Sequence, residues 1–229
     1  MSKIYDNSNE AKFEDGLHQI LTNPNVERAD FCTGYFNLRG WRLVADDVEK
    51  LPGAEVFEPV TSATGLTKNV PVPRVCRLLV GMQRPAADLI SEMYGLGDPL
   101  ADAKQVQRWR RQVAADFRRQ LTLGVPTAED EKGLQLLKKQ LESGKVCVKL
   151  HLRFPLHAKL YLVHRPDNSA PVVSVMGSSN LTFSGLSKNG ELNAEFGDFH
   201  DNEKLAAWFD DRWDDVFERV KCDCPTCAA

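Results

Sequence analysis

The sequence contains no hydrophobic run long enough to cross a bilayer, for which about 20 consecutive apolar residues are needed. Its first residues, Met1 to Asn7, are mostly polar and are not typical of a secretory signal. It also contains no internal repeat and no low-complexity tract. From these absences we expect a cytoplasmic protein with no membrane partner and no large disordered region.

An excess of positive charge is also absent, because 29 lysines and arginines are balanced by 32 aspartates and glutamates, giving a net charge of −3. Any surface that binds nucleic acid must therefore be local. The best candidate is the stretch from Ala101 to Leu121, which has the pattern of a basic amphipathic helix. Either its exposed arginines contact a phosphate backbone, or they only keep a solvated helix soluble; the candidates are Arg108, Arg111 and Arg118.

The cysteines are too few and too scattered for the disulfide framework of a small secreted domain. Cys32, Cys76 and Cys147 lie in apolar, strand-like contexts that favour buried free thiols. The other three form a C-x-C-x-x-C pattern, one ligand short of a closed zinc site: Cys222, Cys224 and Cys227. They are surface thiols, or a ligand from elsewhere or from a further segment completes them. We assign residues 1–221 to one domain and 222–229 to a tail that could begin another segment.

Helical and strand-like patterns alternate along the chain, and 42% hydrophobic residues suit one globular domain. Apolar residues at helical spacing predict helices at Glu10–Leu21, Leu38–Leu51, Leu134–Leu141 and Asp201–Lys221. Strands are expected at Arg28–Phe36, Ala54–Val60, Arg74–Val80 and Lys145–Leu152, with a loop at Thr61–Pro73. This alternation predicts an α/β fold with a β-sheet flanked by helices. We expect the strand at Lys145–Leu152 to pair antiparallel with the strand that follows it.

The most informative stretch is the apolar, strand-like segment from Leu156 to Val163, which contains His157 and Lys159. Because side chains alternate along a strand, these two residues are expected on the same face. An imidazole and an ammonium group would then stand side by side.

A second apolar run follows and ends at Gly177, which permits a sharp turn. The turn delivers two hydroxyls and a carboxamide, from Ser178, Ser179 and Asn180. Such groups are suited to binding phosphate oxygens. Together with a nucleophilic histidine and a charge-neutralising lysine, they predict a phosphoryl-transfer site that needs no metal.

His157-x-Lys159 followed by Gly177-Ser178-x-Asn180 resembles the signature of the phospholipase D superfamily, whose members cleave phosphodiesters through a covalent phosphohistidine. The resemblance implies a phospholipase D-like fold with a mixed sheet, and a hydrolase without metal or cofactor. It implies His157, Lys159, Asn180 and Glu191 as catalytic residues. Phosphate binding would fall to Lys159, Ser178, Ser179 and Asn180. Glu191, preferred over Glu195, would orient His157 by accepting its other ring N–H.

Two further comparisons with the family concern position 164 and the loop after the first strand. The family places an aspartate five residues after the lysine, where this sequence has His164, while Asp167 follows three places later. In the family the loop after the first strand lies near the active site. Residues of that loop are therefore either at the rim of the site or part of the core and its turns; they are Tyr35, Asn37 and Arg39.

The phosphohistidine route needs two histidines, one that attacks and one that protonates the leaving oxygen. The chain has a single H-x-K motif, so we expect a homodimer with one composite site at its interface. Single-motif members resemble nucleases of restriction-type and helicase-linked bacterial defence systems. We therefore expect an endonuclease acting on DNA, with a fused or partner helicase or specificity module. The alternatives are a non-catalytic nucleic-acid-binding module of such a system and a hydrolase of lipids or other small diesters.

Overall fold

The computed structural model describes residues 3–8, 10–61, 67–81, 111–112, 114–119, 121–122, 127–151 and 156–218. Four candidate residues lie outside the described part of the chain: Arg108, Cys222, Cys224 and Cys227.

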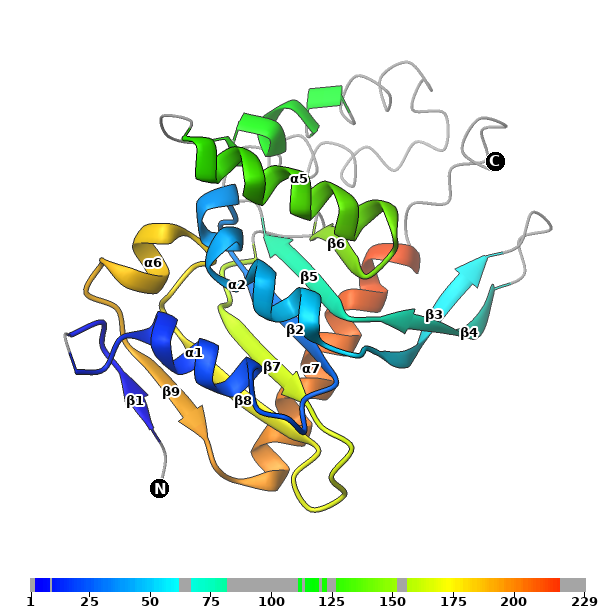
Figure 1. The fold of residues 1–229 in the computed structure, drawn as a ribbon. Coiled ribbons are helices and arrows are strands. Elements are labelled where there is room, and N and C mark those ends of the chain that lie inside the picture. The colour runs from blue at the N-terminus through cyan, green and yellow to red at the C-terminus, as the bar shows by residue number, and fades with distance from the viewer. Residues whose placement is uncertain are drawn as a thin grey trace.

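A mixed seven-stranded sheet forms the centre of the structure, in the order β1-β9-β8-β7-β2-β5-β6 (Figure 1). Strands β2, β5 and β6 are parallel to one another, whereas each neighbouring pair from β2 through β7, β8 and β9 to β1 is antiparallel. The strands are β1 (Ile4–Tyr5), β2 (Arg28–Thr33), β5 (Cys76–Gly81), β6 (Val146–His151), β7 (Leu160–His164), β8 (Val172–Gly177) and β9 (Asn193–Phe196).

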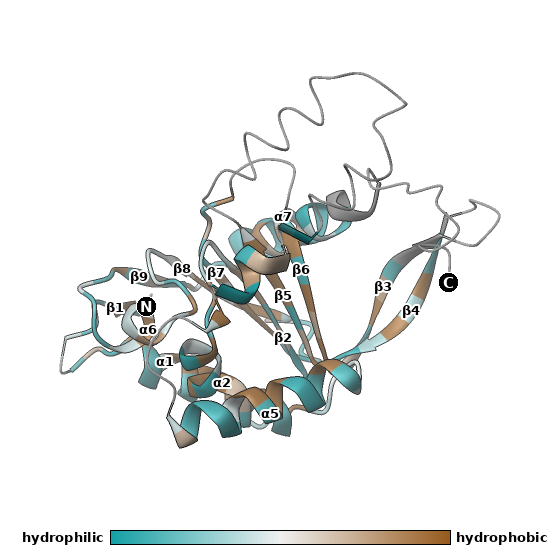
Figure 2. Ribbon diagram, turned by 90° about the horizontal axis from the view of Figure 1, so that it is seen from above, coloured by the Kyte–Doolittle hydropathy of each residue, from teal (hydrophilic) through white to brown (hydrophobic). Residues whose placement is uncertain are grey.

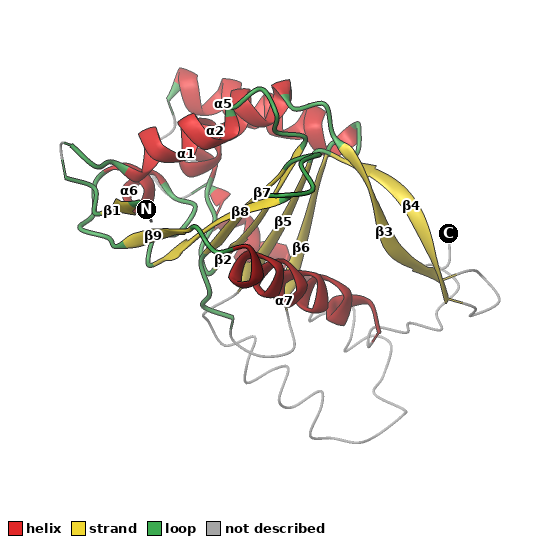
Figure 3. Cartoon of the chain, turned by 90° about the horizontal axis from the view of Figure 1, so that it is seen from below, coloured by secondary structure: helices red, strands yellow, loops and turns green. Residues whose placement is uncertain are grey.

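Helices cover both faces of this sheet, as Figures 2 and 3 show. One face carries α1 (Phe13–Leu21), α2 (Leu38–Lys50), α5 (Ala128–Glu142) and the short α6 (Phe183–Ser187), and the other carries α7 (Phe199–Glu218). The predicted fold class, an α/β fold with a mixed sheet flanked by helices, is confirmed. No helix in the described ranges is both long and apolar enough to span a membrane.

The helices form where the apolar spacing and the end signals agree. Thr127 accepts a hydrogen bond from the backbone N–H of Asp130, and the Asp130 carboxylate accepts one from the Thr127 N–H, so α5 begins with a complete capping box. Gly144 follows α5 with a φ of 72°, a backbone conformation that glycine adopts without steric cost.

Two clusters of buried side chains hold the layers together. The larger lies between the sheet and α1, α2 and α5, and includes Phe13, Phe31 and Trp41. The smaller lies under α7 and includes Phe209 and Trp213, both fully buried. The amphipathic helix predicted near the C-terminus therefore docks on the sheet with its apolar side.

Two strand predictions were wrong. The expected loop at Thr61–Pro73 is largely strand β4 (Thr67–Arg74), which pairs with β3 (Ala54–Thr61) in a separate two-stranded sheet. Prolines are tolerated there because the ribbon has open edges. Strand β6 is also not the neighbour of β7, because β2 and β5 lie between them. Proximity in sequence does not decide pairing where parallel strands are joined by crossovers.

Candidate active site

The site lies where β2 and β8 end and the segment before β7 enters the sheet. His157 and Lys159 precede β7, which begins at Leu160, so the prediction that they lie within the strand was wrong. A Cβ added at Gly34, just after β2, would lie 3.0 Å from Cδ2 of His157 and 3.2 Å from Oδ1 of Asn180. The histidine and the asparagine are therefore packed against the same point of the backbone.

Lys159 lies beside His157, although the extended segment is not part of the sheet. Its Nζ is 2.8 Å from Nδ1 of His157 and 2.7 Å from the carbonyl oxygen of the same residue. The lysine side chain is buried and the histidine is exposed. An ammonium group has no lone pair, so in this arrangement it donates to Nδ1 and the ring proton resides on Nε2.

The surroundings lower the pKa of both side chains. Partial burial is the main cause of the lowered pKa of His157, and the positive charge of Lys159 adds to it. Burial lowers the pKa of Lys159, while the negative charge of Glu191 acts in the opposite direction. His157 is therefore favoured in its neutral form at neutral pH, which is the form that a nucleophile requires.

Ser178 and Glu191 form a hydrogen-bonded pair next to these two residues. The Ser178 hydroxyl donates to Oε2 of Glu191 at 2.5 Å and accepts from the Leu192 backbone N–H at 3.0 Å. Within the described residues, the Glu191 carboxylate bonds to Ser178 and not to His157, in contrast to the expected contact. Glu195 lies elsewhere, where it accepts a hydrogen bond from the Tyr5 hydroxyl.

Ser179 does not face the site. Its side chain is fully buried, its Oγ accepts a hydrogen bond from Nδ2 of Asn193 at 2.8 Å, and its N–H donates to Oδ1 of the same residue at 3.2 Å. Ser179 and Asn193 thus join the turn after β8 to the start of β9. Of the two serine hydroxyls in this turn, that of Ser178 is exposed and can reach a phosphate.

Asn180 is held by its carbonyl oxygen. Oδ1 accepts a hydrogen bond from the Tyr35 backbone N–H at 2.9 Å and lies 3.3 Å from the hydroxyl of Thr33. The amide NH₂ therefore remains as the donor of this side chain. No pattern in the sequence points to Thr33, whose buried hydroxyl also accepts from the Leu181 N–H and so ties β2 to the loop after β8.

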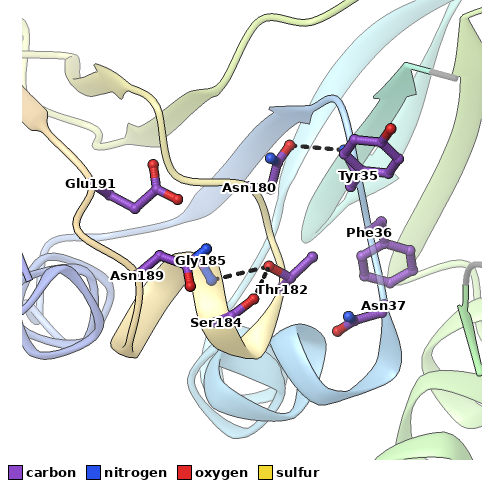
Figure 4. Close-up of a pocket in the computed structure, with 9 residues that line it drawn as sticks. All are labelled: Tyr35, Phe36, Asn37, Asn180, Thr182, Ser184, Gly185, Asn189 and Glu191. Atoms are coloured by element: carbon purple, nitrogen blue, oxygen red, sulfur yellow. Dashed lines mark hydrogen bonds between the residues drawn. The ribbon is translucent and has the colours of Figure 1, made fainter. Parts of the chain in front are cut away.

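A pocket of about 240 Å³ opens beside this group, between the loop after β2 and the loop around α6 (Figure 4). It shares Asn180 and Glu191 with the candidate phosphate site. Two of the predicted rim residues, Tyr35 and Asn37, line it. The third, Arg39, instead pairs with Asp130 of α5 at 3.2 Å.

Comparison with known families agrees with the geometry. The model of a family described as "Cardiolipin synthase, PLD-like domain" matches residues 76–213, more than half of the 229-residue chain. The chain belongs to this phospholipase D-like family. The predicted superfamily is thereby confirmed, and with it a phosphodiesterase type of chemistry. None of the curated proteins compared with the chain matches it.

His164, at the position where the phospholipase D family has an aspartate, is part of a buried charge network. Its Nε2 lies 2.7 Å from Oδ2 of Asp30, a fully buried residue of β2. Arg77 bonds to both oxygens of Asp30 at 2.7 and 2.8 Å, and Arg28 bonds to Oδ2 at 2.5 Å. A carboxylate of the neighbouring strand therefore lies beside position 164.

The charges of this network determine its protonation. Burial raises the pKa of Asp30, but Arg77, His164 and Arg28 together outweigh that effect and hold the pKa well below its ordinary value. Burial lowers the pKa of His164, although Asp30 opposes the effect. His164 is therefore a structural residue at the end of β7 remote from His157.

The basic stretch is described in part. Residues 114–119 are helical, and Arg111 and Arg118 are exposed. Phe117 packs against the core, and its ring stacks on that of Phe36 with centroids 6.3 Å apart. Because Phe36 also lines the pocket, this contact places the described part of the basic stretch beside the candidate site.

Proposed function

We propose that the protein is a metal-independent phosphodiesterase that cleaves DNA through a covalent phosphohistidine on His157. The observation that carries the proposal is an exposed histidine with an ammonium group 2.8 Å from Nδ1 and with Asn180 packed on the same backbone point. Lys159, Ser178 and Asn180 supply donors of the kind that stabilise a phosphoryl group in transfer.

The first step follows from the hydrogen bonds in the site. A phosphate oxygen competes with Nδ1 of His157 for the ammonium group of Lys159. Once Nδ1 is released, solvent water accepts the proton from Nε2 of the exposed ring and returns one to Nδ1, which leaves a lone pair on Nε2. A bond then forms between Nε2 and phosphorus while the bond from phosphorus to the leaving oxygen breaks. Glu191 is our candidate to accept a hydrogen bond from Nδ1–H of His157. To do so, its carboxylate must give up its hydrogen bond with Ser178.

Both steps need a second group, which protonates the leaving oxygen as its bond to phosphorus breaks and then, as a base, activates the water that releases His157. The other four of the chain's five histidines are in different situations from His157. His151 ends β6 and pairs with Gly81, which lies against Leu156, but its side chain is buried, whereas a general acid must reach the leaving oxygen. His18 lies on α1, His164 lies at the far end of β7, and His200 follows the end of β9 remote from Gly177. A second copy of the chain supplies the missing histidine in our proposal.

An uncovered apolar surface next to the site suits that second copy. Ile4, Ala194, Met176 and Leu160 are register partners across β1, β9, β8 and β7, so their side chains lie in one row on one face. Leu160 is buried in the cluster under α7, whereas Met176 is 42% and Ile4 61% exposed. Leu192, which precedes β9 and follows Glu191 directly, is 62% exposed. The apolar surface therefore begins beside the site, where a partner's His157 would have to enter.

The dimer is tested by charge substitution on this surface. Met176→Glu and Leu192→Glu should convert a dimer to a monomer in sedimentation velocity and abolish cleavage. Leu134→Glu is the matched control, because Leu134 is 47% exposed on α5, on the opposite face of the sheet. Dimers that persist in both variants would contradict the assignment. So would a monomeric wild type that binds anionic vesicles through this surface, which would favour a lipid substrate.

Nucleic acid is the substrate that we propose, because Arg111 and Arg118 offer an exposed positive surface near the site of a protein that is acidic overall. Labelled single- and double-stranded DNA should be cleaved in excess chelator by the wild type and not by His157→Ala. Cleavage that chelator stops would contradict the metal-independent route. Salt-sensitive DNA binding by both proteins without cleavage would favour the non-catalytic binding module.

A further inference from the structure

The pocket beside the site has a lining that is unlike the phosphate-binding group next to it. Six of its nine lining residues are polar or acidic, two are aromatic and one is glycine, and none is lysine, arginine or histidine. A second phosphate would find no cation in this lining to neutralise it. An acyl chain would leave the polar side chains without partners. The lining suits an uncharged ring that carries hydrogen-bonding groups.

The walls of the pocket are fixed before any ligand binds. Asn37 accepts a hydrogen bond from Gly40 N–H and Thr182 accepts one from Gly185 N–H, so each caps the helix that follows it. Asn7, which has a φ of 60°, donates from Nδ2 to the carbonyl oxygens of Gly185 and Asn189. The loop around α6 is thus tied to the N-terminal segment, far from it in sequence. A wall that is already ordered favours binding by lowering its entropic cost.

The fixed walls leave suitable donors and one aromatic surface. Asn37 and Asn180 use their carbonyl oxygens within the fold, so within the described residues their NH₂ groups remain as donors. Tyr35 is partly exposed, and its ring stands at the pocket in Figure 4. A volume of about 240 Å³ is smaller than that of most drug-sized sites, so the pocket suits one ring-sized group.

We infer that this pocket binds the nucleobase next to the scissile phosphodiester, stacked on Tyr35 and contacted by the amides of Asn37 and Asn180. The inference rests on the proposed function, because it assumes that the phosphate beside the pocket belongs to a nucleic acid. Aromatic side chains bind unpaired bases by stacking, which tolerates different bases. The pocket therefore predicts a preference for single-stranded or locally opened DNA.

The test compares two esters with the same leaving group, thymidine 5′-(p-nitrophenyl phosphate) and methyl p-nitrophenyl phosphate. In Tyr35→Ala the ratio of kcat/KM for the thymidine ester to that for the methyl ester should fall about tenfold, the order of one lost stacking contact. Ser184→Trp, which fills the pocket from its exposed rim, should lower the same ratio. Phe57→Ala is the matched control, because Phe57 is an exposed aromatic residue of the separate β3–β4 ribbon.

Equal losses on the two esters in both variants would overturn the inference, since they would indicate disturbance of Asn180 and not loss of a base contact. If the wild type cleaves neither ester, the proposed function fails and binding of free thymidine is followed by NMR instead. Shifts of the Tyr35 and Thr182 resonances that disappear in Ser184→Trp would still support a base-binding pocket. No shift at high thymidine concentration would refute it.

Discussion

The two ends of strand β7 carry histidines in opposite situations. His164 is only 13% exposed, contacts the carboxylate of Asp30 at 2.7 Å, and belongs to a network with two arginines. His157 is exposed and has as its neighbour a lysine whose charge lowers its pKa. At one end of the strand every charge is compensated within the fold. At the other end, the ammonium group of Lys159 donates to His157, and the carboxylate of Glu191 accepts from Ser178.

The contrast shows how one residue type serves structure and chemistry within the same strand. Asp30 and Arg28 occupy the two ring nitrogens of His164 and leave neither for a ligand. A lysine beside an exposed histidine keeps it neutral and attracts an anionic group to the same place. The difference lies in the partners and in the access to solvent, and each of the following changes alters one of these.

Replacing each of the two histidines separately with alanine should distinguish the residue needed for activity from the one needed for stability. His157→Ala should lower kcat by about 10⁴-fold or more, since the nucleophile is lost, with the midpoint of urea unfolding nearly unchanged. His164→Ala should keep kcat per folded molecule and lower the free energy of unfolding by about 2 kcal/mol, because the buried Asp30 loses a partner. Activity that survives in His157→Ala would contradict the contrast.

Removing the central charge of the network should cost more than removing a peripheral one. Asp30→Asn leaves two arginines without their buried carboxylate and should lower the free energy of unfolding by about 3–5 kcal/mol. Asp210→Asn removes a carboxylate that also bonds to Arg77 but is 53% exposed, so the loss should stay below about 1 kcal/mol. Urea denaturation measures both, and equal losses would show that Asp30 is not the centre of the network.

Acid should destabilise the protein through the buried end of β7. Because burial lowers the pKa of His164 below 6.5, the unfolded chain binds its proton more readily than the folded protein does. The free energy of unfolding should therefore fall as the pH drops below about 6.5, and Asp30 adds a loss of the same sign at more acidic pH. His164→Gln should make the decline between pH 6.5 and 5 shallower. A slope as steep as that of the wild type would exclude His164 as its source.

At the exposed end, the effect of Lys159 on His157 should be visible without turnover. Lys159→Met removes the positive charge, so the pKa of His157 should rise, while partial burial still keeps it below its ordinary value. An NMR titration of the Hε1 resonance of the His157 imidazole measures this shift in pKa. A lower pKa in the variant would contradict the electrostatic account of the site.

Local patterns in the sequence predicted much of this fold. The periodicity of α1, α2 and α7 and the capping box of α5 are encoded within a few residues, and the motif identified His157, Lys159 and Asn180 as neighbours. Pairing across the sheet could not be read in the same way. Asp30 meets His164 through the register of β2 and β7, and Ser179 turns to Asn193 because of the geometry at Gly177. These contacts depend on where distant segments meet.

The central claim is that His157 becomes covalently bonded to phosphorus. Wild-type protein should be mixed with a labelled DNA substrate in excess chelator, quenched within the first turnover at alkaline pH, which preserves phosphohistidine, and digested for mass spectrometry. We predict a phosphodiester adduct on His157 that is absent from His157→Ala. Cleavage by the wild type without any adduct, or an adduct on another residue, would contradict the account.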